Sequence, residues 1–246
     1  MNVALGIDVG ATGIKGALVN IKTGNLTTER YKLQTPKSKK PKDIIAVIKQ
    51  IVEHFDWKGK RLGIGIPSVI INDKTVTASN IDKSWKDFPI QQELEKALAS
   101  SLVVLNDADA AGLAEIYYRD DNASGTQILL TLGTGIGSAV FLNGKLLKNT
   151  ELGQIMFKNN IAEKLVSNSA RIKLDLSWDN YGKELGEYLT YIYSLFYPEL
   201  IILGGGISKK FAKFSKNFAP HLNVKPASKF NNTGIIGAAL ATKLLK

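Results

Sequence analysis

The sequence contains one short glycine-rich pattern twice. Residues 7–20 read IDVGATGIKGALVN and residues 130–143 read LTLGTGIGSAVFLN; with one gap, Gly10 aligns with Gly133 and Gly13 with Gly135. Each copy predicts a strand, a tight turn and a second strand. Two glycine-rich hairpins can be similar by chance, but each copy opens about half of the 246 residues. The pattern therefore predicts a duplication, with two similar α/β domains that face each other across a cleft.

The segment between the two copies predicts alternating strands and helices. After the first hairpin, a third strand is expected near residues 26–31. Apolar residues at helical spacing follow, and short apolar strands then alternate with further helices. Strands are expected at residues 61–66 and 102–106. One helix is expected to begin after residue 42, and two more are expected at residues 90–98 and 109–118. This order, βββαβαβα, is typical of a mixed α/β domain.

Composition excludes several classes of protein. The chain has no cysteine and two histidines, which excludes a disulfide framework, a catalytic thiol, a cysteine-rich zinc site and a multi-histidine metal centre. No apolar run, glycine included, exceeds eight residues, whereas a membrane-spanning helix needs about 20. The N-terminus lacks the pattern of a secretory signal. We therefore expect a cytoplasmic protein with no membrane partner.

The glycine-rich turns predict phosphate binding. Glycine permits positive φ and lets a ligand approach backbone N–H groups closely, and those groups then bind phosphate oxygens. A third glycine cluster follows an apolar strand at residues 200–203 and precedes an expected helix from Ser208, an arrangement that binds a nucleotide phosphate. A tight turn without a ligand is the alternative for each cluster. The candidates are Gly10, Thr12 and Lys15 in the first copy, Gly133, Thr134, Gly135 and Gly137 in the second, and Gly204, Gly205 and Gly206 in the third cluster.

Two aspartates lie where a strand is expected to end. Asp107 follows the strand at residues 102–106, where it can accept the proton of an attacking hydroxyl, the base role in phosphoryl transfer to an alcohol. Its alternative is an N-cap of the next helix. Asp8 precedes the first glycine turn and is a candidate to hold Mg²⁺ through water, because magnesium on phosphates usually has few protein ligands. A carboxylate bonded to the turn backbone is the alternative for Asp8.

Positive charge is concentrated in the second half of the chain. The formal net charge is +10, and residues 124–246 carry 15 basic and 7 acidic side chains. From Leu200 onward there are eight lysines and no carboxylate. Such a surface attracts polyanions, and a merely solvated basic surface is the alternative. Because no aromatic-rich basic motif of a nucleic-acid module is present, nucleic acid is not an expected partner.

Four motifs together resemble the ROK family of sugar kinases and repressors. They are DVGATGIK at residues 8–15, LNDADAA at 105–111, LGTGIG at 132–137 and ELG at 151–153. The segments NIDKSW at 80–85 and NDADAAGLAE at 106–115 are similar to the polyphosphate glucokinase branch of that family. The resemblance runs from residue 6 to about residue 241, and several motifs in the right order make it specific.

The resemblance implies an actin-like ATPase (ribonuclease H-like) fold of two α/β domains. We expect them at residues 1–108 and 109–246, with a C-terminal helix at about 234–246 that packs back on the first domain. The family also implies a homodimer. ROK repressors carry an added N-terminal DNA-binding segment, and the phosphate hairpin here starts at Gly6, so DNA repression is not expected.

By the same resemblance, Asp107 is the base that activates the sugar 6-hydroxyl. The residues expected at the sugar are Asn80, Asn106, Asp107, Glu151, Gln154 and Glu163. Gln154 stands where the family pattern Glu-x-Gly-His has histidine, so sugar binding is expected to be weakened or altered. The residues that follow lack a glutamate that this branch often carries, and Met156 and Phe157 are expected to pack in the core. Without the histidine and the cysteine-rich loop that hold zinc in many members, no structural zinc is expected.

The resemblance implies a magnesium-dependent kinase that transfers a phosphoryl group from inorganic polyphosphate, or from ATP, to the 6-hydroxyl of glucose. The first two glycine turns and Asp8 would hold the phosphates, and Gly204 to Gly206 would lie beside the adenosine when ATP is used. Lys209, Lys213 and Lys216, at helical spacing on one face, are expected to guide the polymer. The alternatives are an ATP-dependent kinase of another hexose and a catalytically weak, sugar-sensing ROK protein.

Overall fold

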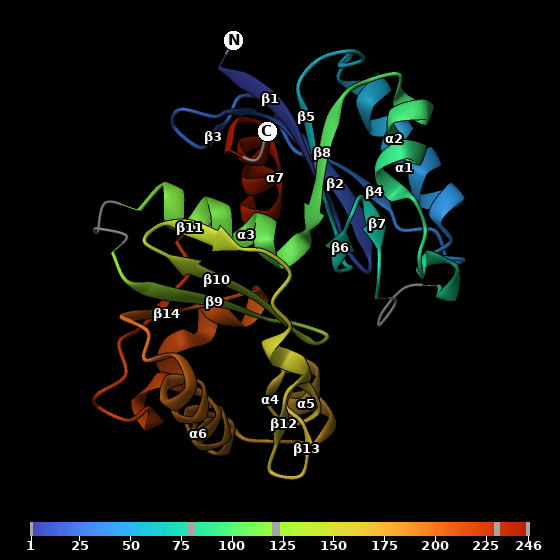
Figure 1. The fold of residues 1–246 in the computed structure, drawn as a ribbon. Coiled ribbons are helices and arrows are strands. Elements are labelled where there is room, and N and C mark those ends of the chain that lie inside the picture. Colours follow the sequence, from blue (N-terminus) through green and yellow to red (C-terminus); the bar gives the residue numbers. More distant parts are fainter. Residues whose placement is uncertain (1, 78–81, 120–123, 229–231, 245–246) are drawn as a thin grey trace. The chain divides into compact units, whose positions relative to one another are not determined.

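The structure is a computed structural model that describes residues 2–77, 82–119, 124–228 and 232–244. The chain divides into two compact units (Figure 1). Unit 1 comprises Met1–Tyr118 and Asn232–Lys246, and unit 2 comprises Arg119–Asn231. The first stretch therefore ends after Tyr118 and not after residue 108 as expected. The reason is that helix α3 (Asp107–Tyr117) packs against the C-terminal helix α7 (Thr233–Leu244) of the same unit.

A six-stranded sheet forms the centre of unit 1. Its strands are β1 (Val3–Val9), β2 (Gly13–Asn20), β3 (Asn25–Leu26), β4 (Tyr31–Gln34), β5 (Leu62–Ile66) and β8 (Leu102–Asn106). The order is β3-β2-β1-β5-β8, and β4 pairs with β2 outside this path. Strands β1, β5 and β8 are parallel, whereas β1 and β2 form an antiparallel hairpin. All five residues of β5 are buried, as is usual for a parallel strand covered on both faces.

Helices cover both faces of this sheet. On one face, α1 (Pro41–His54) and α2 (Ile90–Leu98) contribute Ile48 and Leu94 to a core that contains Ile7 of β1. On the other face, Ile235 of α7 packs with Ala4. Alternate residues of β1 therefore serve two different cores, which follows from the two-residue period of a strand.

Glycines in the sheet let α7 lie directly on it. A Cβ at Gly6 would overlap the carbonyl oxygen of Ile235, and a Cβ at Gly63 would overlap that of Ala238. Neither glycine has positive φ, so the reason for glycine here is close approach and not backbone conformation. The position of α7 on unit 1 therefore depends on these two residues.

A five-stranded sheet forms the centre of unit 2. Its strands are β9 (Thr126–Leu132), β10 (Ile136–Leu142), β11 (Lys145–Leu147), β14 (Leu200–Gly204) and β15 (Val224–Pro226). Helix α6 (Trp178–Phe196) packs Leu185 and Leu189 against Ile128 and Leu130 of β9. Two short helices precede α6, namely α4 (Glu163–Val166) and α5 (Asn168–Lys173).

The two units repeat one topology around their central hairpins. The order β2-β1-β5-β8 of unit 1 corresponds to the order β10-β9-β14-β15 of unit 2. In each case the hairpin is antiparallel and the next two strands are parallel. The turns also match, because residues 10–12 join the first hairpin and residues 133–135 join the second. The predicted pair of similar α/β domains is confirmed.

Several elements differ from the prediction. The third strand is split into β3 and β4, because Thr27 and Thr28 bond with their side chains to the backbone of Leu18. The segment after the third glycine cluster forms 3₁₀ helices, η3 (Gly206–Lys213) and η4 (Ser215–Asn217), and not an α-helix. The short hairpins and 3₁₀ turns that were not predicted are β6 (Ile70–Ile71), β7 (Lys74–Thr75), η1 (Lys83–Trp85), η2 (Leu152–Gln154), β12 (Met156–Phe157) and β13 (Asn160–Ile161).

In the described part of the chain, no helix combines the length and the apolar character that crossing a bilayer requires.

Candidate functional site

The carboxyl edge of the parallel strands in unit 1 holds both predicted aspartates. Asp8 of β1 is in register with Gly65 of β5, and Ile66 of β5 is in register with Asn106 of β8. Asp107 directly follows Asn106. One strand therefore separates the two aspartates, which places their backbones roughly 10 Å apart. Ligands of open α/β sheets bind at this edge.

Helix α3 is capped by Asn106 and not by Asp107. The Asn106 side-chain oxygen accepts the backbone N–H groups of Ala108 at 2.8 Å and of Asp109 at 3.2 Å. Its Nδ2 donates to the Ser68 carbonyl oxygen at 3.2 Å. The N-cap alternative for Asp107 is therefore wrong. Asp107 is the first residue of the helix and half-buried, and its Oδ1 accepts the Ala108 N–H at 2.8 Å.

Asp8 lies between Lys15 and the first turn of α7. Lys15 Nζ is 3.5 Å from Asp8 Oδ2, because the two residues are opposite each other in the β1–β2 hairpin. A Cβ at Gly234 would come within 2.8 Å of the Asp8 carboxyl carbon, so glycine leaves room for this carboxylate. Burial raises the pKa of Asp8, and the Lys15 charge opposes that rise. Lys15 therefore balances the charge of Asp8 in this structure.

The first glycine turn is closed by its own backbone and by Thr35, which directly follows β4. The Gly10 N–H donates to the Gly13 carbonyl oxygen at 3.1 Å, and Thr35 Oγ1 donates to the Gly10 carbonyl oxygen at 2.6 Å. Thr12 is exposed at the tip of the turn. Thr12 is therefore open to solvent, as a phosphate-binding residue must be.

The second glycine turn is held by a glutamate and a short helix. The Gly133 N–H donates to the Gly135 carbonyl oxygen at 3.0 Å, and the Gly133 carbonyl oxygen accepts the Ser169 N–H of α5 at 3.1 Å. Glu163 Oε2 accepts the Ile136 N–H at 3.3 Å. A Cβ at Gly135 would overlap that carboxylate, whereas a Cβ at Gly133 would meet open space. Gly135 is therefore required for the position of Glu163.

The glycines of both hairpin turns have ordinary φ angles. Among the glycines of the three clusters, Gly205 has a positive φ, whereas the glycines of the two hairpin turns do not. The sequence argument from positive φ is therefore wrong for the hairpins. Close approach is the reason instead, since Gly13 lies against the Lys32 side chain and Gly135 against Glu163.

Glu151 and Glu163 form an acidic pair in unit 2. Burial raises the pKa of Glu151, and the negative charge of Glu163 raises it further. Glu151 directly precedes η2. The first residue of η2 is held in place by a hydrogen bond from the Leu152 N–H to Ser138 Oγ at 2.9 Å. The Tyr188 hydroxyl donates to the Leu152 carbonyl oxygen at 3.0 Å. Strand β10 and helix α6 therefore hold the segment that carries Glu151.

The residues after Glu151 differ in exposure. Gln154 is exposed. Phe157 is buried and lies 5.6 Å from the Tyr188 ring, as expected of a core residue. The expectation for Met156 is wrong, because this side chain is 59% exposed. The two residues share strand β12, whose pleat turns one side chain inward and its neighbour outward.

The third glycine cluster lies at the carboxyl edge of the sheet in unit 2. Gly204 of β14 is in register with Thr131 of β9. Gly205 has a φ of 84°, and a Cβ there would press on the backbone of Leu132, directly before the second glycine turn. The second and third clusters are therefore neighbours in unit 2.

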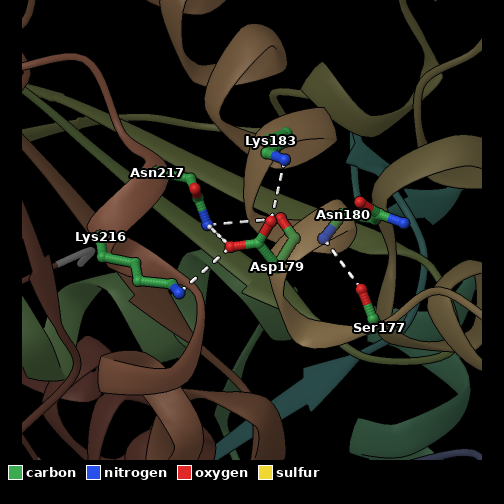
Figure 2. A network of polar contacts seen from close by, with 6 residues as sticks. All are labelled: Ser177, Asp179, Asn180, Lys183, Lys216 and Asn217. Atoms are coloured by element: carbon green, nitrogen blue, oxygen red, sulfur yellow. Dashed lines mark hydrogen bonds and ion pairs between the residues drawn. The ribbon is translucent and has the colours of Figure 1, made fainter.

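The three lysines of the predicted polymer path do not share one helical face. In a 3₁₀ helix residues three apart are aligned, so Lys213 aligns with Lys210 and not with Lys209. All of these lysines are exposed. Lys213 Nζ lies 5.9 Å from the centre of the Trp178 ring, and Lys216 Nζ lies 3.2 Å from Asp179 Oδ1 (Figure 2).

Some residues at these sites were not predicted, and one predicted residue is not described. Asn80 lies outside the described residues. Ser68, Thr35 and Gly234 touch predicted site residues, yet no motif or spacing signals them, because their contacts arise only from tertiary packing. Within the described ranges, no three His, Cys, Asp or Glu side chains are grouped so as to hold a metal ion.

Known proteins are similar to this chain along nearly its whole length. The ROK family model matches residues 4–161. The polyphosphate glucokinase of Mycobacterium tuberculosis (strain CDC 1551 / Oshkosh) is 41% identical over 239 residues, which cover 96% of this chain and 90% of that protein. The polyphosphate glucokinase of Mycobacterium leprae (strain TN) is 38% identical over 239 residues, covering 96% and 74%.

Two solved structures are also similar to this chain over nearly its whole length. The crystal structure of an inorganic polyphosphate/ATP-glucomannokinase from Arthrobacter sp. strain KM matches with a TM-score of 0.95 and 38% identity, with both chains fully covered. A ROK family glucokinase from Streptomyces griseus in complex with glucose and AMPPNP matches with a TM-score of 0.83, covering 96% and 98% of the two chains. Because the two sequences are 22% identical, this match shows the fold alone, which is the two-domain actin-like ATPase fold. The family model and the identity along nearly the whole chain show that this protein belongs to the ROK family.

Proposed function

We propose that this protein is a kinase that transfers the terminal phosphoryl group of inorganic polyphosphate, and also of ATP, to the 6-hydroxyl of glucose. The observation that carries the proposal is the 41% identity with a polyphosphate glucokinase along 96% of the chain. The name of the Arthrobacter protein pairs polyphosphate with ATP, which supports the use of both donors. The products would be glucose 6-phosphate and either a polymer one unit shorter or ADP.

Asp107 is the proposed general base. Its carboxylate would take the proton of the 6-hydroxyl while that oxygen forms its bond to the terminal phosphorus and the bond to the remaining phosphate chain breaks. The position at the carboxyl edge of β8 supports this role. So does the cap formed by Asn106, which fixes the first turn of α3 and with it the backbone of Asp107.

The two hairpin turns are the proposed phosphate sites, and Asp8 is the residue proposed to hold Mg²⁺ through water. The donor chemistry fits, because Asp8 is a carboxylate beside the first turn and Mg²⁺ prefers oxygen ligands. With no group of three such side chains in the described ranges, phosphate oxygens and water would supply most of the coordination. Bound magnesium would neutralise charge on the phosphates. The residues proposed to hold the phosphates are Asp8, Gly10, Thr12, Lys15, Gly133, Thr134, Gly135 and Gly137, with Gly204, Gly205 and Gly206 beside the nucleotide of ATP.

Glu151 and Glu163 are the proposed sugar ligands in unit 2, with Gln154 and, in the segment outside the described residues, Asn80. Both glutamates are half-buried and accept hydrogen bonds when ionised, as sugar hydroxyls require. For Asn106 we propose a positioning role in place of sugar contact. Its oxygen and one N–H are already used inside unit 1.

Lys209, Lys213 and Lys216 are the proposed guides of the polymer, joined by Lys210 because of the 3₁₀ geometry. Their exposure and the absence of carboxylates from Leu200 onward support attraction of a polyanion. A homodimer and a cytoplasmic location, where glucose and ATP are both at hand, complete the proposal by family resemblance.

A second candidate is a kinase of another hexose. Gln154 favours it, because an amide here replaces the imidazole of the family pattern. If Gln154 contacts the sugar, Gln154→His changes the KM for glucose and mannose and leaves the KM for the donor unchanged. An unaltered KM for both sugars would place Gln154 outside the sugar site.

The test of the proposed function is glucose 6-phosphate formation by the purified protein with Mg²⁺. Long-chain polyphosphate and ATP are compared as donors at low and moderate salt. We expect turnover with both donors, and a steeper loss with polyphosphate as salt rises, because screening weakens a many-charge contact more. No turnover of glucose or mannose with either donor would contradict the proposal and leave the sugar-sensing alternative.

A further inference from the structure

Asp179 is the centre of a polar network at the start of α6 (Figure 2). Its Oδ2 lies 2.9 Å from Lys183 Nζ, and its Oδ1 lies 3.2 Å from Lys216 Nζ. Asn217 Nδ2 donates to the Asp179 carbonyl oxygen and to Oδ1, each at 3.3 Å. These hydrogen bonds from Lys183, Lys216 and Asn217 lower the pKa of Asp179 to about 2. Asp179 is therefore ionised at every physiological pH.

The surroundings of this carboxylate are otherwise basic. Lys210 and Lys213 are aligned in η3, and Lys216 lies in the next turn, η4, after Phe214. Lys209, Lys210 and Lys213 form no ion pair with any residue that the structure describes, whereas Lys216 is paired with Asp179. We call Lys210, Lys213 and Lys216 the lysine row. Asp179 is thus a counter-charge at one end of the row.

The pair between Asp179 and Lys216 is weak enough to exchange. The side chains are 43% and 66% exposed, and ion pairs in such positions contribute at most about 1 kcal/mol. A polyanion that binds several lysines at once also releases counter-ions, so it can replace a single exposed carboxylate. Lys216 can therefore change partner without any change of fold.

We propose that Asp179 is an internal competitor of inorganic polyphosphate for Lys216, and so a residue that sets the preference between long polyphosphate and short donors. The inference rests on the proposed function and on the use of the lysine row by the polymer. In the free protein Asp179 holds Lys216. A chain long enough to reach the end of the row displaces the carboxylate, whereas a donor too short to reach Lys216 gains nothing from its release.

The test is equilibrium binding of long-chain polyphosphate to the full-length protein, without sugar or turnover, alongside the KM for ATP. Asp179→Asn keeps an acceptor for Asn217 but removes the charge. We expect it to tighten polyphosphate binding about two- to fivefold, the equivalent of one exposed ion pair, and to leave the KM for ATP unchanged. Lys216→Gln weakens polyphosphate binding, and its effect is larger in the Asp179→Asn background, where the lysine is no longer shared.

Glu187→Gln is the matched control. It removes one negative charge from the same helix, but Glu187 pairs with Lys158 at 2.7 Å, and no ion pair joins it to the lysine row among the described residues. Equal tightening by Glu187→Gln would show a general effect of net charge and overturn the proposal. So would equal tightening for ATP, or unchanged polyphosphate affinity in Asp179→Asn.

The outcome separates this inference from the proposed function. Wild-type turnover of polyphosphate together with unchanged affinity in Asp179→Asn overturns the inference alone. Absence of both polyphosphate binding and polyphosphate-dependent turnover in the wild type overturns both. Thermal unfolding of each variant shows that it is folded under the conditions of the binding experiment.

Discussion

At the scale of single residues, two glycines of one turn have different roles. A Cβ at Gly135 would overlap the Glu163 carboxylate, whereas a Cβ at Gly133 would meet nothing. We expect Gly135→Ala to displace Glu163 and to raise the KM for glucose about tenfold or more, as for one lost charged hydrogen bond. Gly133→Ala would place its methyl group in open space at the proposed phosphate site, so it should change the KM of the donor instead. Steady-state kinetics with each substrate varied in turn measure both effects, and equal effects of the two variants on the glucose KM would contradict this division.

Glu151 predicts a dependence of stability on pH. Its pKa in the folded protein is raised above 4.5 by burial and by Glu163. The folded state therefore binds the Glu151 proton more tightly than the unfolded state does. The contribution of protonated Glu151 to the free energy of unfolding is complete below pH 4.5 and is lost as pH rises through the raised pKa. Glu151→Gln should unfold at a higher temperature than the wild type at pH 7, and this difference should disappear below pH 4.5. An equal difference at both pH values would show that ionisation of Glu151 is not its cause.

At the scale of elements, the cap of α3 connects stability to turnover. Asn106→Ala removes the acceptor of two backbone N–H groups, which should lower the free energy of unfolding by about 1 kcal/mol. Because Asp107 is the next residue, we expect kcat to fall while the KM for glucose stays near that of the wild type. A raised KM with unchanged kcat would instead make Asn106 a direct sugar ligand.

The contact of α7 with the sheet gives a matched pair of substitutions in β5. Gly63→Ala would place a methyl group on the Ala238 carbonyl, so we expect a loss of about 1–3 kcal/mol in the free energy of unfolding. Gly65→Ala is the control, since its Cβ would meet its neighbours at an ordinary 3.5 Å. Urea unfolding of both variants measures the difference. A loss no larger in Gly63→Ala than in Gly65→Ala would mean that α7 can move without cost.

At the scale of the whole molecule, the sequence predicted the topology better than the environment of each site residue. The repeated glycine pattern marks the turns, and the spacing of apolar residues distinguishes strands from helices. Strand β8 and helix α2 were therefore predicted with their observed bounds. The cap formed by Asn106 is local, and asparagine directly before a helix is a usual signal for it. The contact of Gly135 with Glu163, in contrast, joins segments distant in sequence, and no local pattern contains that information. The apolar pattern also does not distinguish a 3₁₀ helix from an α-helix or the inner side of β12 from its outer side, and this is why Lys209 was placed on the wrong face and Met156 in the core.

The central claim is that Asp107 acts as the base of a sugar kinase. Its most direct test is the rate of glucose 6-phosphate formation from polyphosphate by Asp107→Asn, with glucose binding of the same variant measured by calorimetry. The account predicts that kcat falls at least about 100-fold while glucose still binds. Turnover close to that of the wild type would contradict the assignment of the base, and a loss of turnover explained entirely by lost glucose binding would make Asp107 a sugar ligand alone.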